Sequence, residues 1–294
     1  MAPIILRFLI IFSSSVALAG LPEVSCFKVN RPAPEPGTLQ SAQALIVRTL
    51  NSAALLEAWR TLFEIRSPLF VAALFDIFAD SENGLTVDSV VLRDHLYSQL
   101  VERTKLKRST VDVYVNILIS NKVLDVDFEA YKAKGKNQDR IILKKYGIQQ
   151  FLAVGETLLG KRPDLPLREL NSLLNAETEK AFQVVRAWAK VFGFSPRLSG
   201  TLSRFPLAVL EVFTDVRGQI REEVDRQILI SEIELSTEYE PSSILNYLLG
   251  FTHTGLLKAI PRDQGGERKT VLVLTSAGRK KYGEVEAAMK QSNP

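Results

Sequence analysis

The chain has 294 residues, of which 46% are apolar and 24% are charged, and its formal net charge is +4. This composition is typical of a folded globular protein and excludes a disordered or fibrous chain. Its one cysteine excludes an intrachain disulfide, and Cys26, His95 and His253 cannot complete a four-ligand Cys/His zinc site. Because the net charge is small, any argument about partners depends on where the charges lie.

Residues 1–37 are predicted to be an extension outside the folded part. Arg7 precedes the apolar run Phe8–Phe12, and Ala17–Gly20 follows (ALAG), as in a secretory signal peptide. The run is too short for a transmembrane helix. The alternative is an apolar extension with no targeting role. Asn30–Gly37 (NRPAPEPG) is a proline-rich linker, so we expect the first domain to start at Thr38.

The segment from Thr38 to Arg162 is predicted to form five helices and one hairpin. Apolar residues at helical spacing indicate helices at 39–65, 68–80, 87–102, 109–120 and 146–160. Ser67 and Pro68 suit the start of the second helix, and Gly160 with Pro163 suits the end of the last. Alternating runs at 123–132 and 140–145, joined by a basic tip that contains Gly135, predict the hairpin.

The segment from 163 to 294 repeats this order. Helices are predicted at 167–194, 206–216, within 222–239, at 241–257 and at 276–290, with a hairpin over 256–274. The match extends to single residues. It pairs Trp59 with Trp188, Tyr114 with Tyr247, and Gly147 with Gly278, at offsets of 129, 133 and 131 residues. The alternative is chance similarity between amphipathic helices.

Two short motifs carry a resemblance to a known family. Leu274–Lys280 (LTSAGRK) and Gly255–Leu257 (GLL) are similar to segments of MarR- and PadR-type winged-helix proteins. The resemblance implies a mainly α fold with small β-hairpin wings, in which two winged-helix domains, 38–162 and 163–294, form a tandem repeat joined by long helices. In those families a helix-turn-helix and a wing bind duplex DNA, and flanking helices form a dimer. The long helices around Trp59 and Trp188 would then form an internal interface.

The two halves differ in charge. Glu102–Lys145 contains 11 Lys/Arg and 6 Asp/Glu, whereas Pro206–Ile260 contains 4 and 9. Because phosphate neutralisation needs Lys and Arg, we expect the first half to bind double-stranded DNA, as a transcription regulator does. The helix that starts at Ser109 would enter the major groove while the wing holds the backbone. The candidate DNA-binding residues are Lys105, Lys107, Arg108, Ser109, Thr110, Asn116, Lys132, Lys134, Lys136, Arg140, Arg268 and Lys269.

The second half is predicted to bind a protein partner, or to form a homodimer through this half and the long helices. Glu238 and Glu240 precede its corresponding helix and would repel phosphate. In the first half, Val113, Ile117 and Ile119 add a second apolar stripe to the candidate DNA-reading helix. This stripe favours the alternative function, a protein-binding tandem winged-helix subunit of a nucleoprotein complex, of the chromosome-condensing or replication-initiation type.

No enzyme, cofactor or metal site is predicted. Gly155–Arg162 (GETLLGKR) has the glycine and lysine spacing of a phosphate-binding loop, but Arg162 stands where Ser or Thr would hold magnesium. A helix C-terminus explains this segment better. We expect a cytoplasmic, nucleoid-associated protein with no membrane contact for the folded part; the alternative is a targeted or secreted protein if residues 1–20 are a signal.

Overall fold

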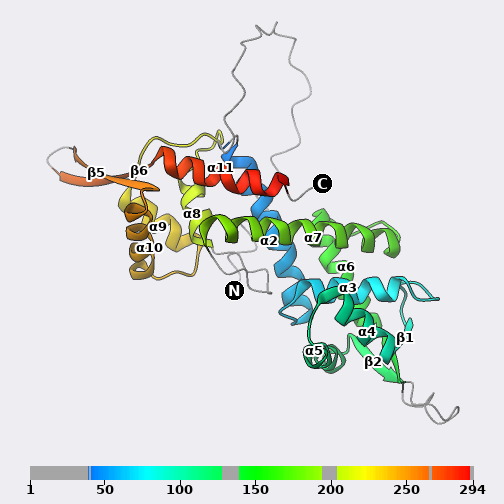
Figure 1. The fold of residues 1–294 in the computed structure, drawn as a ribbon. Helices are drawn as coiled ribbons and strands as arrows, with labels where there is room; N and C mark the ends of the chain where they lie inside the picture. Colours follow the sequence, from blue (N-terminus) through cyan, green and yellow to red (C-terminus); the bar gives the residue numbers. More distant parts are fainter. Residues whose placement is uncertain (1–38, 40, 128–138, 194–203, 265–266, 292–294) are drawn as a thin grey trace, which may run out of the picture. The chain divides into compact units, whose positions relative to one another are not determined.

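Two long helices, α2 (Ala42–Phe63) and α7 (Leu167–Phe192), each begin one half of the fold (Figure 1). The computed structural model describes residues 39, 41–127, 139–193, 204–264 and 267–291. These residues belong to one compact unit, Pro36–Pro294. The predicted signal and linker in residues 1–37 lie outside the described residues, as does the hairpin tip that carries Lys132, Lys134 and Lys136.

The first half continues from α2 through three further helices, a three-stranded sheet and a closing helix. Its strands are all antiparallel and lie in the order β1-β3-β2. The elements are α3 (Pro68–Ala79), β1 (Val90–Leu92), α4 (Arg93–Thr104), α5 (Arg108–Ser120), β2 (Leu124–Asp127), β3 (Arg140–Leu143) and α6 (Lys145–Leu159).

The second half has the same order of elements after α7. Its sheet is also antiparallel, in the equivalent strand order β4-β6-β5. The elements are α8 (Arg204–Phe213), β4 (Val224–Asp225), α9 (Arg226–Ser236), α10 (Pro241–His253), β5 (Leu257–Gln264), β6 (Glu267–Leu274) and α11 (Ser276–Gln291). The mainly helical fold with small sheets is therefore confirmed.

The sequence analysis predicted neither first strand, and its helix at 87–102 was wrong in its first residues. Residues 87–102 were expected to be one helix, but Val90–Leu92 pairs with Ile142–Arg140 as β1, and α4 begins only at Arg93. Val224–Asp225 likewise pairs with β6 ahead of α9. Three or two residues are too few to show an alternating pattern, and a partner strand far along the chain supplies their hydrogen bonds. Ser67 precedes α3 as predicted, but its side chain makes no capping hydrogen bond.

The two tryptophans join the long helices through a reciprocal pair of hydrogen bonds. The indole Nε1 of Trp59 on α2 donates to Thr178 Oγ1 on α7 at 2.9 Å, and Nε1 of Trp188 on α7 donates to Thr49 Oγ1 on α2 at 3.0 Å. All four side chains are buried. Trp59 and Trp188 are related by the same sequence offset as Thr49 and Thr178. The contact is therefore isologous in form, as in a twofold dimer interface.

Each long helix contributes to two hydrophobic cores. The C-terminal part of α2, with Trp59 and Phe63, packs in the core of the first half, whereas its first turns, with Leu45 and Ile46, pack in the core of the second. The N-terminal part of α7 packs in the first core, and Trp188 packs in the second. Each half therefore needs the other half's helix to complete its core.

Two glycines hold equivalent positions at the start of α6 and α11. A Cβ atom at Gly147 would lie 2.9 Å from both Val123 O and the Leu143 side chain. A Cβ atom at Gly278 would lie 2.4 Å from Leu256 O and 2.7 Å from the Leu274 side chain. Because each closing helix lies so close to its hairpin, any larger residue at these two sites would force neighbouring atoms, including backbone, to shift.

Candidate functional site

The turn between α4 and α5 gathers the basic residues that were predicted to bind DNA. Lys105 ends α4 in the left-handed region (φ 57°), and Lys107 precedes α5 with extended backbone. Lys105, Lys107, Arg108 and Ser109 are all exposed, and Thr110 is half-buried. No side chain caps the start of α5, so backbone N–H groups of its first turn remain available to an anion.

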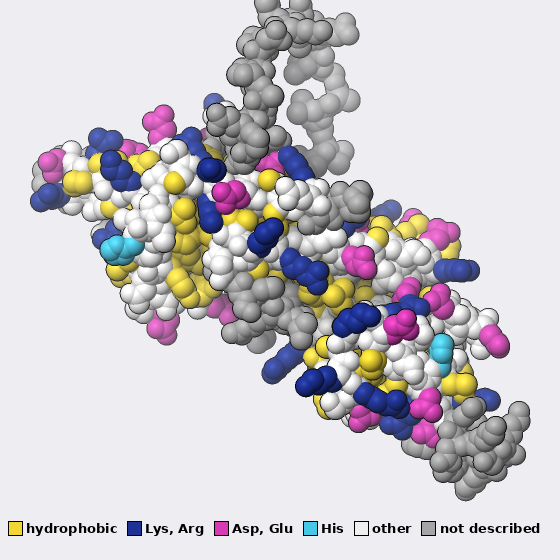
Figure 2. Space-filling view, in the orientation of Figure 1, with side chains coloured by type: hydrophobic (Ala, Val, Ile, Leu, Met, Phe, Trp, Pro, Cys, Tyr) yellow, Lys and Arg dark blue, Asp and Glu magenta, His cyan; other side chains and the backbone are white. Residues whose placement is uncertain are grey.

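The outer face of α5 is mainly polar. Val111, Val115 and Leu118 are fully buried in the core, while Ser109, Asn116 and Ser120 are exposed. Of the apolar stripe expected on this helix, Ile117 and Ile119 pack against the core, and Val113 is exposed. Of the three apolar residues in this stripe, only Val113 is therefore exposed. Figure 2 shows Lys and Arg side chains gathered over the region of α5.

Asp112, the one carboxylate of α5, is held by side chains of α4. Tyr97 Oη donates to Asp112 Oδ1 at 2.9 Å, and Arg93 lies 3.4 Å from the same oxygen. Arg93 also pairs with Asp139 at 3.0 Å, directly before β3. One arginine therefore links α4, α5 and the base of the hairpin. Asp112 therefore serves an internal contact.

The electrostatics of this cluster favour the ion pairs. Hydrogen bonds to Tyr97 and to Asp139 raise the pKa of Arg93, so the guanidinium stays charged. Burial raises the pKa of Tyr97, so its hydroxyl stays protonated and can donate to Asp112. Arg93 and Tyr97 were missed from sequence, although their spacing of four residues on a helix places them on one face. Their partner Asp139 is distant in sequence and gave no signal.

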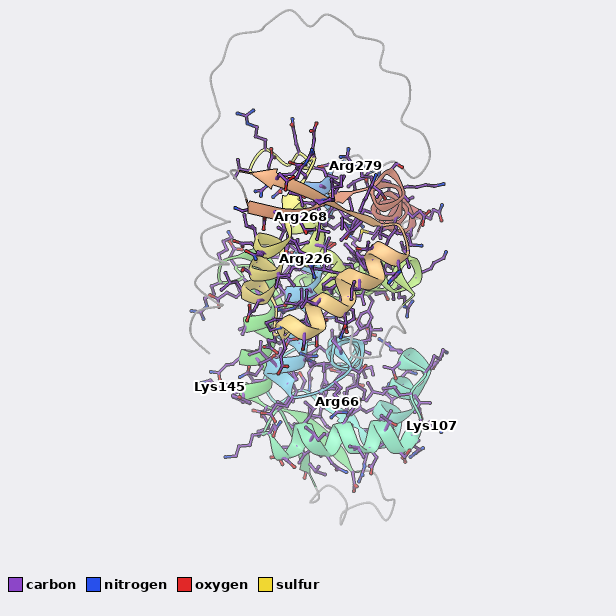
Figure 3. The ribbon with its side chains drawn as sticks, turned by 90° about the vertical axis from the view of Figure 1, so that its left-hand side faces the viewer. Arg66, Lys107, Lys145, Arg226, Arg268 and Arg279 are labelled. Carbon is purple, nitrogen blue, oxygen red and sulfur yellow. The ribbon has the colours of Figure 1, made fainter. Side chains whose placement is uncertain are left out.

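The other candidate residues lie on the sheets. Arg140 is exposed at the start of β3, beside Asp139. Arg268 and Lys269 are exposed on β6 of the second half, where their Cα partners on β5 are Asp263 and Arg262. The structure therefore brings Lys105, Lys107, Arg108, Ser109, Thr110 and Asn116 together on the α4–α5 pair, and it places Arg268 and Lys269 on a different sheet. Figure 3 shows Lys107 in the first half and Arg268 in the second.

The equivalent surface of the second half has the opposite charge. Arg93 and Arg226, the first residues of α4 and α9, are 133 positions apart, as are Arg108 and Pro241, the first residues of α5 and α10. This alignment pairs Lys105 with Glu238 and Lys107 with Glu240. Arg226 is retained and exposed (Figure 3), but Leu245 replaces the Asp112 that its counterpart binds.

The segment that resembles a phosphate-binding loop lies at the end of α6. Gly155–Leu159 is the end of α6, and Gly160 terminates that helix in the left-handed region (φ 68°), so the phosphate-loop-like segment is a helix C-terminus, as predicted. Within the described residues, no three His, Cys, Asp or Glu side chains are grouped to hold a metal ion. Within the same residues, no helix combines the length and apolarity that a bilayer span requires.

Comparison with known proteins gives no family assignment. No protein-family model and no curated protein matches this chain. The functional argument therefore rests on the geometry and charge of the α4–α5 surface.

Proposed function

We propose that the protein binds duplex DNA through its first half, and that both halves are winged-helix domains related as a tandem repeat. The observation that carries the proposal is the exposed basic start of α5, a helix with a polar outer face. In this assignment α4 and α5 are the helix-turn-helix, α5 is the recognition helix, and the β2–β3 hairpin is the wing. A role in transcription regulation follows from this binding mode and is part of the proposal.

The order of elements supports the winged-helix assignment. Both halves have a helix, a short strand, two helices at the helix-turn-helix position, and a hairpin whose second strand lies between the other two. The core side of each recognition helix is apolar, with Val111 and Val115 buried in α5 and Ile244 and Leu248 buried in α10. Burial on this side leaves the opposite side of each helix for a ligand.

The charge of the α5 surface supports a phosphate ligand. Lys105, Lys107 and Arg108 lie within four residues at the start of the helix, where the helix dipole also favours an anion. The pair between Arg108 and Asp94 spans 3.3 Å but is well exposed, so it is weak and open to exchange for phosphate. Asn116, on the exposed side of α5, has the side chain that best reads adenine in the major groove.

Arg93 supports the proposed mechanism because it fixes the wing relative to the recognition helix. Its bonds to Asp112 and Asp139 hold two elements that must contact the same duplex. A preset angle between them lowers the ordering cost of binding. The same bonds neutralise Asp112, which would otherwise repel phosphate from the centre of α5.

The test is fluorescence anisotropy with a labelled random duplex over a salt series. In the full-length protein, Lys105→Glu/Lys107→Glu should weaken binding by about tenfold or more at low salt and reduce the salt slope by about 2. The matched control is Lys190→Glu/Lys280→Glu, which makes the same charge change at exposed sites on α7 and α11.

The two variants separate local contacts from net charge. Equal losses in both would show that only net charge matters and would contradict binding through α5. Absence of binding by the wild-type protein at low salt would contradict the proposed function as a whole. Asn116→Ala, measured on a set of duplexes of different sequence, then tests whether α5 reads bases: it should reduce discrimination between sequences more than affinity for random DNA.

A further inference from the structure

A network of polar side chains ties the end of α4 to α3 and α7. Arg103, in the last turn of α4, forms ion pairs with Asp76 on α3 and, at 3.0 Å, with Asp80 directly after that helix. Two amides of α7 bind the first of these carboxylates. Nδ2 of Asn171 and Nδ2 of Asn175 donate to Asp76 Oδ1 at 3.2 Å and 3.0 Å. The network therefore joins three helices, α3, α4 and α7 (Figure 1).

The two amides of α7 are poorly suited to packing alone. Asn171 is only 2% exposed. Its Oδ1 and that of Asn175 are both buried, and in the described part of the chain no donor reaches either oxygen. Because burying an unpaired amide oxygen is unfavourable, these side chains gain their place through the bonds that they donate to Asp76.

The second half has apolar residues at the positions of these amides. The offset of 129 residues that relates the two tryptophans also relates Asn171 to Ala42 and Asn175 to Ile46. Ala42 and Ile46 are buried in the core of the second half. Apolar side chains can therefore fill the equivalent places on a long helix, so packing does not require the amides. Buried polar contacts of this kind favour one geometry rather than adding stability.

The polar network is found in the half that holds a strained turn. Lys105 follows Arg103 by two residues and ends α4 in the left-handed region (φ 57°), which residues other than glycine adopt at a cost in free energy. The position of Arg103 is taken by Ser236 in the second half. There α9 ends, and Thr237 continues with extended backbone (φ −132°). A strained conformation persists only where its surroundings hold it, and Arg103 is anchored directly before the strained residue.

We infer that Arg103 is a positioning residue for the basic turn between α4 and α5, and that α7 sets its place through Asp76. The planar guanidinium can hold two carboxylates at once, which an ammonium group does less well. The fixed end of α4 then presents Lys105 and Lys107 in one arrangement. The effect of this network on duplex affinity rests on the proposed function, whereas its effect on the turn does not.

The test compares the full-length protein with Asn171→Ala/Asn175→Ile, which gives α7 the residues that α2 carries at the equivalent buried positions. The fold should be retained by circular dichroism. Hydrogen exchange at the Lys105 N–H, which donates to Val101 O, should become faster because the turn loses its anchor. Affinity for a labelled random duplex should fall by about three- to tenfold at low salt, because the turn must be ordered on binding. The salt slope should stay the same, because no phosphate contact is removed.

Arg103→Lys separates the bridging role from charge alone. The variant keeps the positive charge but loses the fork that joins two carboxylates, so it should show the same faster exchange and weaker binding. Wild-type exchange and affinity in this variant would overturn the inference. The matched control is Ser172→Ala/Ala176→Ile, which places the same two new residues one position further along α7, at exposed sites. It should leave both measurements unchanged.

The two measurements distinguish this inference from the proposed function. Unchanged exchange at Lys105 in Asn171→Ala/Asn175→Ile would show that α7 does not hold the turn and would overturn the inference, even if the wild-type protein binds DNA. Faster exchange with unchanged duplex affinity would overturn the positioning role in binding. Absence of duplex binding by the wild-type protein would contradict the proposed function instead, and exchange at Lys105 alone would then decide whether α7 holds the turn.

Discussion

The two halves of the molecule share an order of elements and differ in the charge of the surface at the start of α5 and of α10. Strand order, the buried tryptophans and the tightly packed glycines recur in both. Before α5, Lys105 and Lys107 of the first half correspond to Glu238 and Glu240, which precede α10 in the second half. The conserved scaffold positions are buried, whereas the differing ones are exposed, so packing constrains the former and ligand chemistry the latter.

The two halves also differ in the ion pairs that link α4, α5 and the hairpin in the first half. Arg93 binds Asp112 and Asp139, and Tyr97 donates to Asp112. In the second half Arg226 remains, while Leu245 stands at the position of Asp112. Leucine cannot accept a hydrogen bond or form an ion pair, so the second half lacks the link that Asp112 provides between α5 and α4.

The largest expected effect tests whether the two scaffolds are equivalent. Trp59→Ala and Trp188→Ala should each lower the free energy of unfolding by about 3–5 kcal/mol, because each opens a cavity and leaves a buried threonine without its donor. Urea denaturation followed by circular dichroism measures both. A loss in one variant several times that in the other would show that the halves do not depend on the shared interface equally.

A smaller effect distinguishes the two glycine contacts. Gly278→Ala should cost about 1–3 kcal/mol, and Gly147→Ala should cost less, since the added Cβ would meet backbone oxygen at 2.4 Å in the first case and 2.9 Å in the second. Thermal unfolding of the two variants provides the comparison. Gly250→Ala, where the structure leaves open space around the new methyl group, serves as the control and should not destabilise the fold. The reverse ranking of the two contact glycines would refute this account.

The stability of the fold is expected to depend on pH through a carboxyl group of the second half. Burial raises the pKa of Glu211 on α8 to about 7 from its ordinary value of 4.5, against the opposing charge of Arg204. Because the folded state holds the proton more tightly, this group favours folding below pH 4.5, and that contribution is lost as pH rises to about 7. Glu211→Gln should remove this dependence and stabilise the fold at pH 8 by about 1–2 kcal/mol. Denaturation at pH 5 and pH 8 measures it; an unchanged difference between the two pH values in the variant would contradict the assignment.

The smallest expected effect concerns the two arginines. Arg93→Met should lower stability by about 1 kcal/mol or less, because its ion pairs are partly exposed, whereas Arg226→Met should have no measurable effect. Under the proposed function, only Arg93→Met should also weaken duplex binding, by releasing the hairpin and exposing Asp112. Equal effects of both substitutions, by denaturation and by anisotropy, would remove the distinction drawn between the halves.

Much of the fold was predictable because apolar periodicity directly reflects burial. The spacing of Val111, Val115 and Leu118 located α5, and the pairing of Trp59 with Trp188 located the long helices. The short strands β1 and β4 were not predictable, since their hydrogen bonds come from residues far along the chain. For the site, the basic residues from Lys105 to Arg108 were found as a cluster, but the contacts of Arg93 with Asp112 and Asp139 were not.

The sequence by itself determined the order of helices, their repetition and the opposite charges of the two halves, because these depend on local periodicity and composition. Only the tertiary structure decided how the side chains are used. It paired Asp112 with Arg93 and Tyr97, partly buried Ile117 and Ile119, and left Leu235 and Leu249 exposed. Periodicity identifies the face of a helix that is apolar, but only the packing of neighbouring elements determines which apolar residues are covered.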